Sequence, residues 1–274
     1  MEQSPIDWSA FDPEAPDKVS YLPQKELRDD QLKAVNAVID GFKEHDRGKL
    51  IMACGTGKTF TSLRIAERIA GRGGAVLFLV PSIALLNQTL LSWNADHDRD
   101  MNMIYFAVCS DSTVGRNDED MSVSDLVCPA TTRTAELTRI WDAIPEDDKE
   151  KSMTVVFSTY QSLPVITKAQ ENGFPDFDLI ICDEAHRTTG VTLAGEQESS
   201  FVQVHDDDYI RAKKRLYMTA TPRLFKASQA RRAAEVGAEL CSMDDEAIYG
   251  PEFYRLSFSE AELGRTFSIT SMAC

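Results

Sequence analysis

Short apolar runs alternate with amphipathic segments along most of the chain. The apolar runs have the length and density of strands covered on both faces, and they occupy residues 50–53, 75–80, 103–108, 153–157, 177–182 and 213–218. Apolar positions recur at helical spacing in residues 26–45, 58–70, 83–93, 136–144 and 226–236. This alternation predicts an α/β fold with a mostly parallel sheet and helices on both faces, and residues 213–218 are expected to be its last strand.

The ends of this pattern divide the chain into three parts. Residues 1–23 carry four prolines and little periodicity, so an extended N-terminal arm is expected there. Residues 24–236 hold the strand–helix alternation and form the predicted domain, within which the polar stretch 109–132 is interpreted as a long surface insertion. Residues 237–274 are interpreted as an exit segment or as the truncated start of a second domain.

The formal net charge of −15 argues against binding of nucleic acid through a globally basic surface, but it does not exclude a local contact strip. The acidic excess lies in blocks that are expected to be solvated loops, namely residues 117–120, 146–150, 205–208 and 244–246. The chain shows neither an apolar run near the roughly 20 residues of a membrane span nor a signal peptide. A cytoplasmic protein without membrane contact is expected.

The six cysteines and four histidines do not fall at metal-binding intervals, so no zinc site is expected. Cys54 lies in the stretch 49–59, before the helix predicted from residue 58, and Cys182 lies in an apolar strand; each is interpreted as a small buried thiol. This use of cysteine fits a reducing compartment.

One stretch has the order of a phosphate-binding loop. An apolar strand leads into a turn with two glycines, and a helix opens at Lys58. The glycines let backbone N–H groups surround a phosphate, and the helix N-terminus adds partial positive charge. Met52 stands where the usual pattern has its first glycine, and the alternative is a chance glycine turn. The predicted nucleotide contacts are Cys54, Gly55, Thr56, Gly57, Lys58 and Thr59.

Two acidic residues, Asp183 and Glu184, follow the apolar run 177–182 directly. A carboxylate at this place can hold Mg²⁺ beside the Thr59 hydroxyl, and its neighbour can orient the attacking water. The predicted metal contacts are therefore Thr59 and Asp183. The alternative is a strand end with solvated acids.

Gln31 lies in the first turns of the predicted helix 26–45. A glutamine amide can donate to and accept from one purine edge, so Gln31 is a candidate reader of adenine. The alternative is solvated helix surface, which the spacing alone favours.

Taken in order, these motifs resemble superfamily 2 helicases and translocases of the DEAD/DEAH type. The motifs are Gln31, Ala53–Thr59, Val80–Ser82, Asp183–His186 and Thr219–Thr221, and their spacing resembles the first RecA-like, ATP-binding domain over roughly residues 24–261. The start of the pattern and the segment Thr159–Ser162 look most like motors of restriction and phage-defence enzymes.

The resemblance implies a P-loop NTPase with ATP and Mg²⁺ as cofactors, in which Gln31 recognises adenine. It implies that Lys58, Asp183 and Glu184 serve hydrolysis and that His186 links the nucleotide site to Thr219 and Thr221. It also implies sequence-independent contacts to the DNA backbone from Pro81, Ser82, Gln88 and Thr159. The local basic residues that could contact DNA are Lys213, Lys214, Arg215, Arg223, Arg231 and Arg232. The alternative is that each of them is solvated surface.

Nothing after Thr221 resembles the second motor domain, which in the family brings an arginine finger to the site. The partners implied are duplex DNA and a second RecA-like domain or partner subunit. The expected function is the ATP-binding lobe of a DNA-dependent ATPase that alone binds ATP–Mg²⁺ and hydrolyses it poorly. The alternatives are a non-catalytic nucleotide-binding module and an RNA helicase lobe.

Overall fold

The computed structural model of the chain describes residues 7, 9, 13, 14, 23–109, 130–193, 201–225 and 238–260. Most of the predicted arm and insertion, and the helix predicted over residues 226–236, lie outside the described residues.

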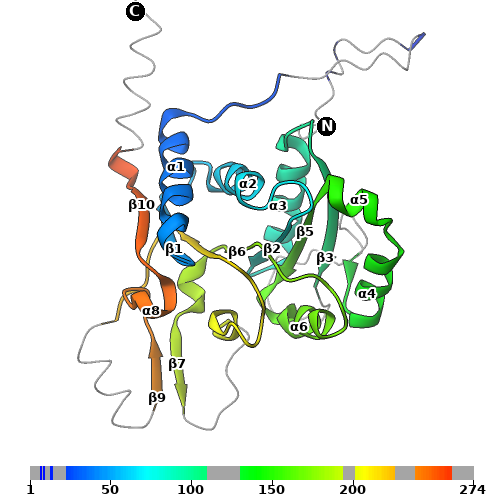
Figure 1. The fold of residues 1–274 in the computed structure, drawn as a ribbon. Coiled ribbons are helices and arrows are strands. Elements are labelled where there is room, and N and C mark those ends of the chain that lie inside the picture. The colour runs from blue at the N-terminus through cyan, green and yellow to red at the C-terminus, as the bar shows by residue number, and fades with distance from the viewer. Residues whose placement is uncertain are drawn as a thin grey trace, which may run out of the picture.

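A parallel sheet forms the centre of the described chain (Figure 1). Its strands are β1 (Arg47–Met52), β2 (Ala75–Val80), β3 (Asn102–Val108), β4 (Ala130–Thr131), β5 (Ser152–Thr159), β6 (Leu179–Cys182), β8 (Arg215–Thr219) and β10 (Glu252–Leu256). They lie in the order β10-β1-β8-β6-β2-β5-β3-β4, and all of their pairings are parallel. The predicted α/β, RecA-like architecture is confirmed.

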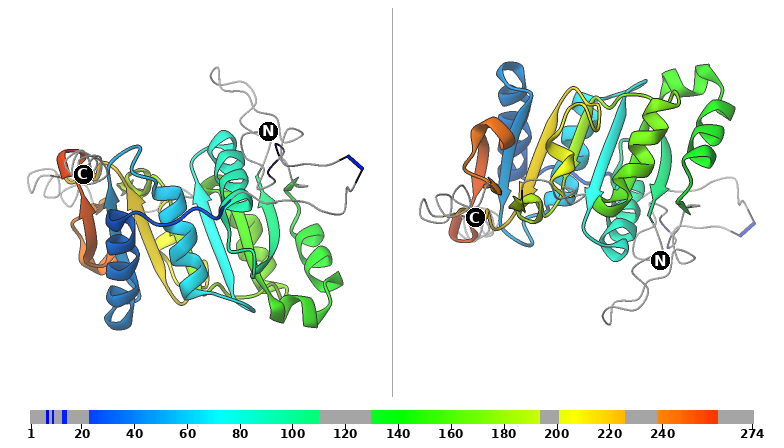
Figure 2. Two further views of the ribbon diagram at one scale, coloured as in Figure 1. Left: turned by 90° about the horizontal axis from the view of Figure 1, so that it is seen from above. Right: turned by 90° about the horizontal axis from the view of Figure 1, so that it is seen from below.

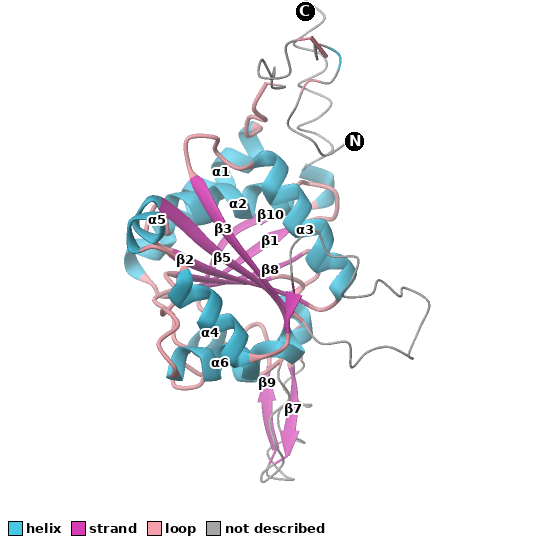
Figure 3. Cartoon of the chain, turned by 90° about the vertical axis from the view of Figure 1, so that its right-hand side faces the viewer, coloured by secondary structure: helices cyan, strands magenta, loops and turns pink. Residues whose placement is uncertain are grey.

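Helices cover both faces of this sheet (Figures 2 and 3). One face carries α1 (Asp29–Glu44), α2 (Lys58–Ile69) and α3 (Ile83–Asp96), and the other carries α4 (Thr134–Ala143) and α6 (Leu163–Glu171). The remaining turns are α5 (Glu146–Lys151), α8 (Glu246–Tyr249), η4 (Tyr160–Ser162), η5 (Ala185–Thr188) and η6 (Gln203–His205).

Strand β2 shows why the sheet is buried on both sides. Its six residues are all buried, and alternate side chains point to opposite faces. Phe78 packs on Trp93 of α3 in the core beneath α1–α3, whereas Leu77 and Leu79 belong to the core beneath α4 and α6. A continuous apolar run is therefore what this strand requires.

A small antiparallel ribbon lies apart from the main sheet, at the bottom of Figure 1. It consists of β7 (Gly190–Leu193) and β9 (Ala238–Cys241). Strand β7 follows the acid pair at residues 183 and 184 after the short turn η5.

The prediction that residues 213–218 form the last strand is wrong, because β10 pairs in parallel with β1. Strand β10 has one neighbour and is only partly buried, so it lacks the continuous apolar run that marks the inner strands. The sheet therefore extends past residue 236, while the division into domains stays a prediction.

The acidic residues of three blocks are exposed to solvent, as expected, but they do not all lie in loops and several make specific contacts. Residues 146–150 form α5, where the Lys149 ammonium lies 4.4 Å from the centre of the Trp141 ring. Asp245 caps α8 by accepting the Ala247 amide at 2.9 Å. In residues 205–208, Asp207 pairs with a buried arginine that is described below. Residues 117–120 lie outside the described residues.

Candidate active site

The phosphate-binding loop joins β1 to α2 at the carboxyl edge of the sheet. Gly55 and Gly57 have φ values of +75° and +85°, which side chains other than glycine rarely adopt. The Thr56 hydroxyl donates to the Ala53 carbonyl oxygen at 2.7 Å and closes the turn. The first amides of α2 are thereby placed where a helix N-terminus can bind a phosphate.

Lys58 points back into this loop, since its ammonium lies 3.2 Å from the Met52 carbonyl oxygen. This contact with the Met52 carbonyl oxygen holds the Lys58 ammonium at the end of β1. Lys58 is therefore placed to exchange that carbonyl for phosphate oxygens.

Gln31 is held against the same loop. Gln31 is only 2% exposed, which contradicts the alternative that it lies on a solvated helix surface. The amide nitrogen donates to the Thr56 carbonyl oxygen at 3.1 Å, and the amide oxygen accepts the Arg28 N–H at 3.1 Å. Arg28 also donates to the Thr56 carbonyl, at 2.6 Å. Recognition of adenine by Gln31 stays a prediction.

The acid pair arrives from β6, which β8 separates from β1 in the sheet. Two strand spacings of about 4.8 Å put the two strand ends roughly 10 Å apart. Burial and the neighbouring Glu184 raise the pKa of Asp183 to about 6, and the Lys58 ammonium opposes this rise. The Lys58 ammonium is therefore close enough to the Asp183 carboxylate to stabilise its charge, while a nucleotide site shared by the two residues stays a prediction.

The chemistry of Asp183 and Thr59 fits Mg²⁺, a cation that prefers oxygen ligands. The Asp183 Oδ1 atom is buried and has no hydrogen-bond partner among the described residues. A buried acceptor of this kind is costly unless a ligand satisfies it. Thr59 stands in the first turn of α2 and is half-buried, and its part in a metal site stays a prediction.

A polar chain leads from the acid pair to β8. Glu184 adopts a left-handed conformation with φ of 49°, the one positive φ of a non-glycine residue in the described ranges. The His186 Nδ1 atom lies 3.2 Å from Glu184 Oε2 and 3.0 Å from Thr219 Oγ1. Thr219 Oγ1 accepts the Thr221 N–H at 3.2 Å. The predicted coupling residues are thus in contact, while their role stays a prediction.

The residues that are predicted to contact DNA lie at the same edge. Val80 and Thr159 are register partners at the ends of β2 and β5, so Pro81 and Ser82 leave the sheet beside Thr159. Ser82 caps α3, its hydroxyl accepting the Leu85 amide at 3.4 Å.

Two of these side chains differ in what they offer to a ligand. Gln88 is exposed on α3. Thr159 is 5% exposed and its hydroxyl is 3.1 Å from the Ser162 hydroxyl, so this side chain is already engaged. Contact of these residues with DNA stays a prediction.

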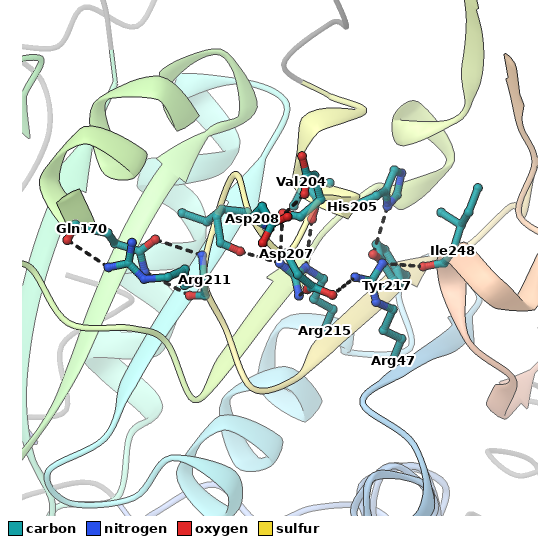
Figure 4. A network of polar contacts seen from close by, with 12 residues as sticks. Arg47, Gln170, Val204, His205, Asp207, Asp208, Arg211, Arg215, Tyr217 and Ile248 are labelled. Atoms are coloured by element: carbon teal, nitrogen blue, oxygen red, sulfur yellow. Dashed lines mark hydrogen bonds and ion pairs between the residues drawn. The ribbon is translucent and has the colours of Figure 1, made fainter.

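Arg215 is buried, so it is neither solvated surface nor an exposed basic residue that could contact DNA. It begins β8 at the sheet edge opposite the phosphate loop, and its side chain is 2% exposed. Its guanidinium donates to the carbonyl oxygens of Val204 and Ile210 at 2.9 and 2.5 Å and pairs with Asp207 (Figure 4). Arg215 therefore holds the segment before β8 in place. Arg231 and Arg232 lie outside the described residues.

The two cysteines that were interpreted as buried thiols differ. Cys182 is fully buried at the end of β6, as expected, and burial raises the pKa of its thiol to about 12. Cys54 is exposed, because the glycine-containing turn carries it to the surface of the phosphate loop. The interpretation of Cys54 is therefore wrong.

Sequence reasoning missed two residues that touch the site. Arg28 braces the phosphate loop, and Tyr160 donates a hydrogen bond to the Asp183 carbonyl oxygen at 2.8 Å. Both contacts end on backbone atoms of distant residues, which no spacing pattern in the sequence reports.

The comparison with known proteins agrees with this geometry. The family described as "Type III restriction enzyme, res subunit" matches residues 24–224. The chain belongs to this family. Its resemblance to the first RecA-like domain of superfamily 2 helicases, of the kind found in restriction enzymes, is confirmed.

Solved structures of restriction enzymes are similar to this chain. The structure of "ATP-dependent Type ISP restriction-modification enzyme LlaBIII bound to DNA" is 45% identical, with a TM-score of 0.76, over 96% of this chain and 17% of that one. The structure of a nuclease-deletion mutant of the Type ISP enzyme LlaGI, in complex with a DNA substrate mimic, is 40% identical, with a TM-score of 0.67. The match covers 88% of this chain and 21% of that one.

Viral helicases are also similar. "Probable helicase A859L" of African swine fever virus is 31% identical over 196 residues, which are 70% of this chain and 19% of the relative. The same protein from another isolate is 30% identical over 215 residues, which are 76% of this chain and 21% of the relative. The chain thus spans about a fifth of the length of these relatives. In the described residues no helix is long and apolar enough to cross a membrane.

Proposed function

We propose that this res-family lobe binds ATP with Mg²⁺ and hydrolyses it in a DNA-dependent motor of a restriction or anti-phage enzyme. The observation that carries the proposal is the electrostatic interaction of Lys58 with Asp183, two residues that follow non-adjacent strands at the carboxyl edge of the sheet. The similar Type ISP structures, one described as ATP-dependent and both containing DNA or its mimic, support it.

In this proposal, the phosphate loop and Lys58 hold the β- and γ-phosphates. Glu184 orients a water whose oxygen attacks the γ-phosphorus as the bond to the β–γ bridging oxygen breaks, which yields ADP and phosphate. Thr59 and Asp183 would hold Mg²⁺, whose positive charge stabilises the transferring group. His186 positions Glu184 and joins it to Thr219, next to the loop that starts at the end of β8.

The lobe is proposed to work in the cytoplasm with a second RecA-like domain or a partner subunit. An arginine finger from such a partner is worth roughly 10³ to 10⁵ in turnover, so the 274-residue chain alone is expected to turn over slowly. Contacts to DNA would come from backbone amides, hydroxyls and amide side chains, which do not require a basic protein.

The test is nucleotide binding and turnover by the wild type, Lys58→Ala and Glu184→Gln, with and without duplex DNA. Lys58→Ala is expected to abolish binding, and Glu184→Gln to keep binding while it abolishes turnover. Equal affinity for ATP in the wild type and Lys58→Ala would discard the proposal. Stimulation by RNA alone would favour an RNA helicase lobe, and binding without turnover under every condition would favour a non-catalytic module.

Gln31 allows a separate test of base recognition. If the glutamine reads adenine, Gln31→Ala lowers the affinity for ATP more than the affinity for GTP, and this is the expected result. An equal loss for both nucleotides would show that Gln31 acts only by holding the Thr56 carbonyl.

A further inference from the structure

Tyr160 reaches from the end of β5 to the acid pair at the end of β6. It opens η4, it is fully buried, and its hydroxyl donates to the Asp183 carbonyl oxygen at 2.8 Å. Its ring stacks on Phe201 at 4.8 Å between centroids and 25° between planes. The ring packing fixes the direction of the hydroxyl.

The hydrogen bond acts at a point where the backbone must be held. The Asp183 amide donates to the Leu79 carbonyl oxygen at 2.9 Å, so Tyr160 completes the restraint of the Asp183 backbone on its other side. The chain then turns at once into the left-handed conformation of Glu184, which is strained for a residue with a Cβ atom.

The Asp183 side chain needs this restraint. Its Oδ1 atom is buried without a hydrogen-bond partner among the described residues, and the hydrogen bond that the carboxyl group receives comes from the backbone of the next residue, Glu184. The place of the carboxylate therefore follows from the place of the backbone at residues 183 and 184.

The same residue belongs to the segment after β5. Thr159, its neighbour, ends β5 and shares a hydrogen bond with Ser162 across the η4 turn. Through Tyr160, a shift of this turn reaches the Asp183 backbone directly.

We propose that Tyr160 is a positioning residue, whose hydroxyl sets the place of the metal-binding acid Asp183 and joins it to the turn after β5. The inference rests on the proposed function, because it assumes that Asp183 holds Mg²⁺ beside ATP. It adds a residue from outside the phosphate loop and the acid pair to the support of the metal site.

The test compares Tyr160→Phe with the matched control Tyr105→Phe in the 274-residue chain. Both substitutions remove one buried hydroxyl and keep the ring, but the Tyr105 hydroxyl has no hydrogen-bond partner in the described part of the chain. Affinity for a fluorescent ATP analogue is measured in EDTA and in Mg²⁺. The ratio of the two affinities is the gain that Mg²⁺ provides, and a merely structural role of the hydroxyl would not change it.

Tyr160→Phe is expected to lower this gain by roughly two- to tenfold, the value of one hydrogen bond, while the affinity in EDTA stays unchanged. Tyr105→Phe should leave both affinities unchanged. A thermal melt of each variant confirms that the fold is kept. An unchanged gain in Tyr160→Phe overturns the inference.

A second background keeps the two proposals distinguishable. In Asp183→Asn, the further change Tyr160→Phe is expected to have no effect on the gain, because the hydroxyl acts through Asp183. An equal effect in both backgrounds overturns the inference. If the wild type binds no ATP in either condition, the proposed function itself fails. If it binds with a gain from Mg²⁺ and Tyr160→Phe matches it, only the role of Tyr160 fails.

Discussion

The backbone amide of Ala53 donates a hydrogen bond to the carbonyl oxygen of Leu256 at 3.0 Å. Ala53 is the residue with which the chain leaves β1 for the phosphate loop, and Leu256 is the last residue of β10. Lys49 of β1 adds a second link, because its buried ammonium donates to the Met243 carbonyl oxygen at 2.9 Å. The phosphate loop is thus supported by residues that the sequence assigned to an exit segment.

The support from β10 can be tested at Phe253. Its ring packs edge-on against Phe42 at 5.0 Å and fills the space where a Cβ atom on Gly41 or Gly48 would lie. Phe253→Ala is expected to lower the free energy of unfolding by about 2 to 3 kcal/mol, less than for a fully buried phenylalanine. Urea unfolding measures the loss. The control is Phe258→Ala, at a residue 63% exposed, and a similar loss there would contradict the prediction.

The phosphate loop has no room for a side chain at Gly57. A Cβ atom there would lie 2.3 Å from Gln31 Nε2, and the Gln31 amide is buried and held by two hydrogen bonds. Gly57→Ala is therefore expected to weaken ATP binding by about tenfold more than Gly55→Ala does. Gly55 is the matched control, since its φ is also positive but nothing lies within 4 Å of its added Cβ. Equal affinities of the two variants would show that the Gln31 contact is unimportant.

Arg215 is expected to be critical for stability although it lies far from the nucleotide. Arg215→Met leaves the Val204 and Ile210 carbonyl oxygens without their donor and leaves Asp207 without one of its two arginines. The expected loss in the free energy of unfolding is about 3 kcal/mol, because each buried carbonyl oxygen left without a donor costs about 1 to 3 kcal/mol. Lys213→Met serves as the control, since the exposed Lys213–Asp178 pair is worth less than about 1 kcal/mol. Calorimetric melts that shift equally for both variants would refute this assignment.

His205 is expected to make stability depend on pH. Desolvation, with Arg47 and Arg215 nearby, lowers the pKa of His205 to about 4, although the Thr188 carbonyl opposes the shift. The unfolded state therefore binds more protons than the folded state between about pH 6.5 and pH 4, and stability falls as the pH is lowered through this window. The neutral imidazole suits both of its contacts. Nε2 can donate to the Thr188 carbonyl oxygen, while Nδ1 can accept from the Tyr217 hydroxyl.

The measurement is urea unfolding of the wild type and His205→Gln at pH 7.5 and pH 5. A shift of this size corresponds to about 3 kcal/mol in full, of which the larger part is lost by pH 5. The wild type should lose more stability over this interval than His205→Gln. An identical loss in the two proteins would show that His205 is not the group responsible.

The inner strands and the phosphate loop were accessible from sequence because one local property determines each. Strand β2 is apolar at every position since both of its faces are covered, and its predicted bounds, residues 75–80, are confirmed. The loop requires glycines and a lysine at fixed spacing, and Asp183 follows a short apolar strand directly. Each of these signals is contained within a few consecutive residues.

The parts that sequence reasoning missed depend on contacts between distant residues. Strand β10 is an edge strand in which only the last residue, Leu256, is buried, and the sequence does not show that it pairs with β1. Arg28 and Tyr160 act through carbonyl oxygens of Thr56 and Asp183, and a backbone acceptor leaves no trace in residue type. The acidic block 205–208 is exposed, as its composition indicates, but composition does not show that Asp207 pairs with a buried arginine.

The position of β8 has a consequence for how the protein folds. This strand lies between β1 and β6 in the sheet but is made after both of them during synthesis. Until β8 is inserted, β1 and β6 each expose an unpaired edge, and such edges recruit other chains. Nascent chains that end before residue 215 are therefore expected to need a chaperone to prevent aggregation, and pairings between such distant segments favour slow folding.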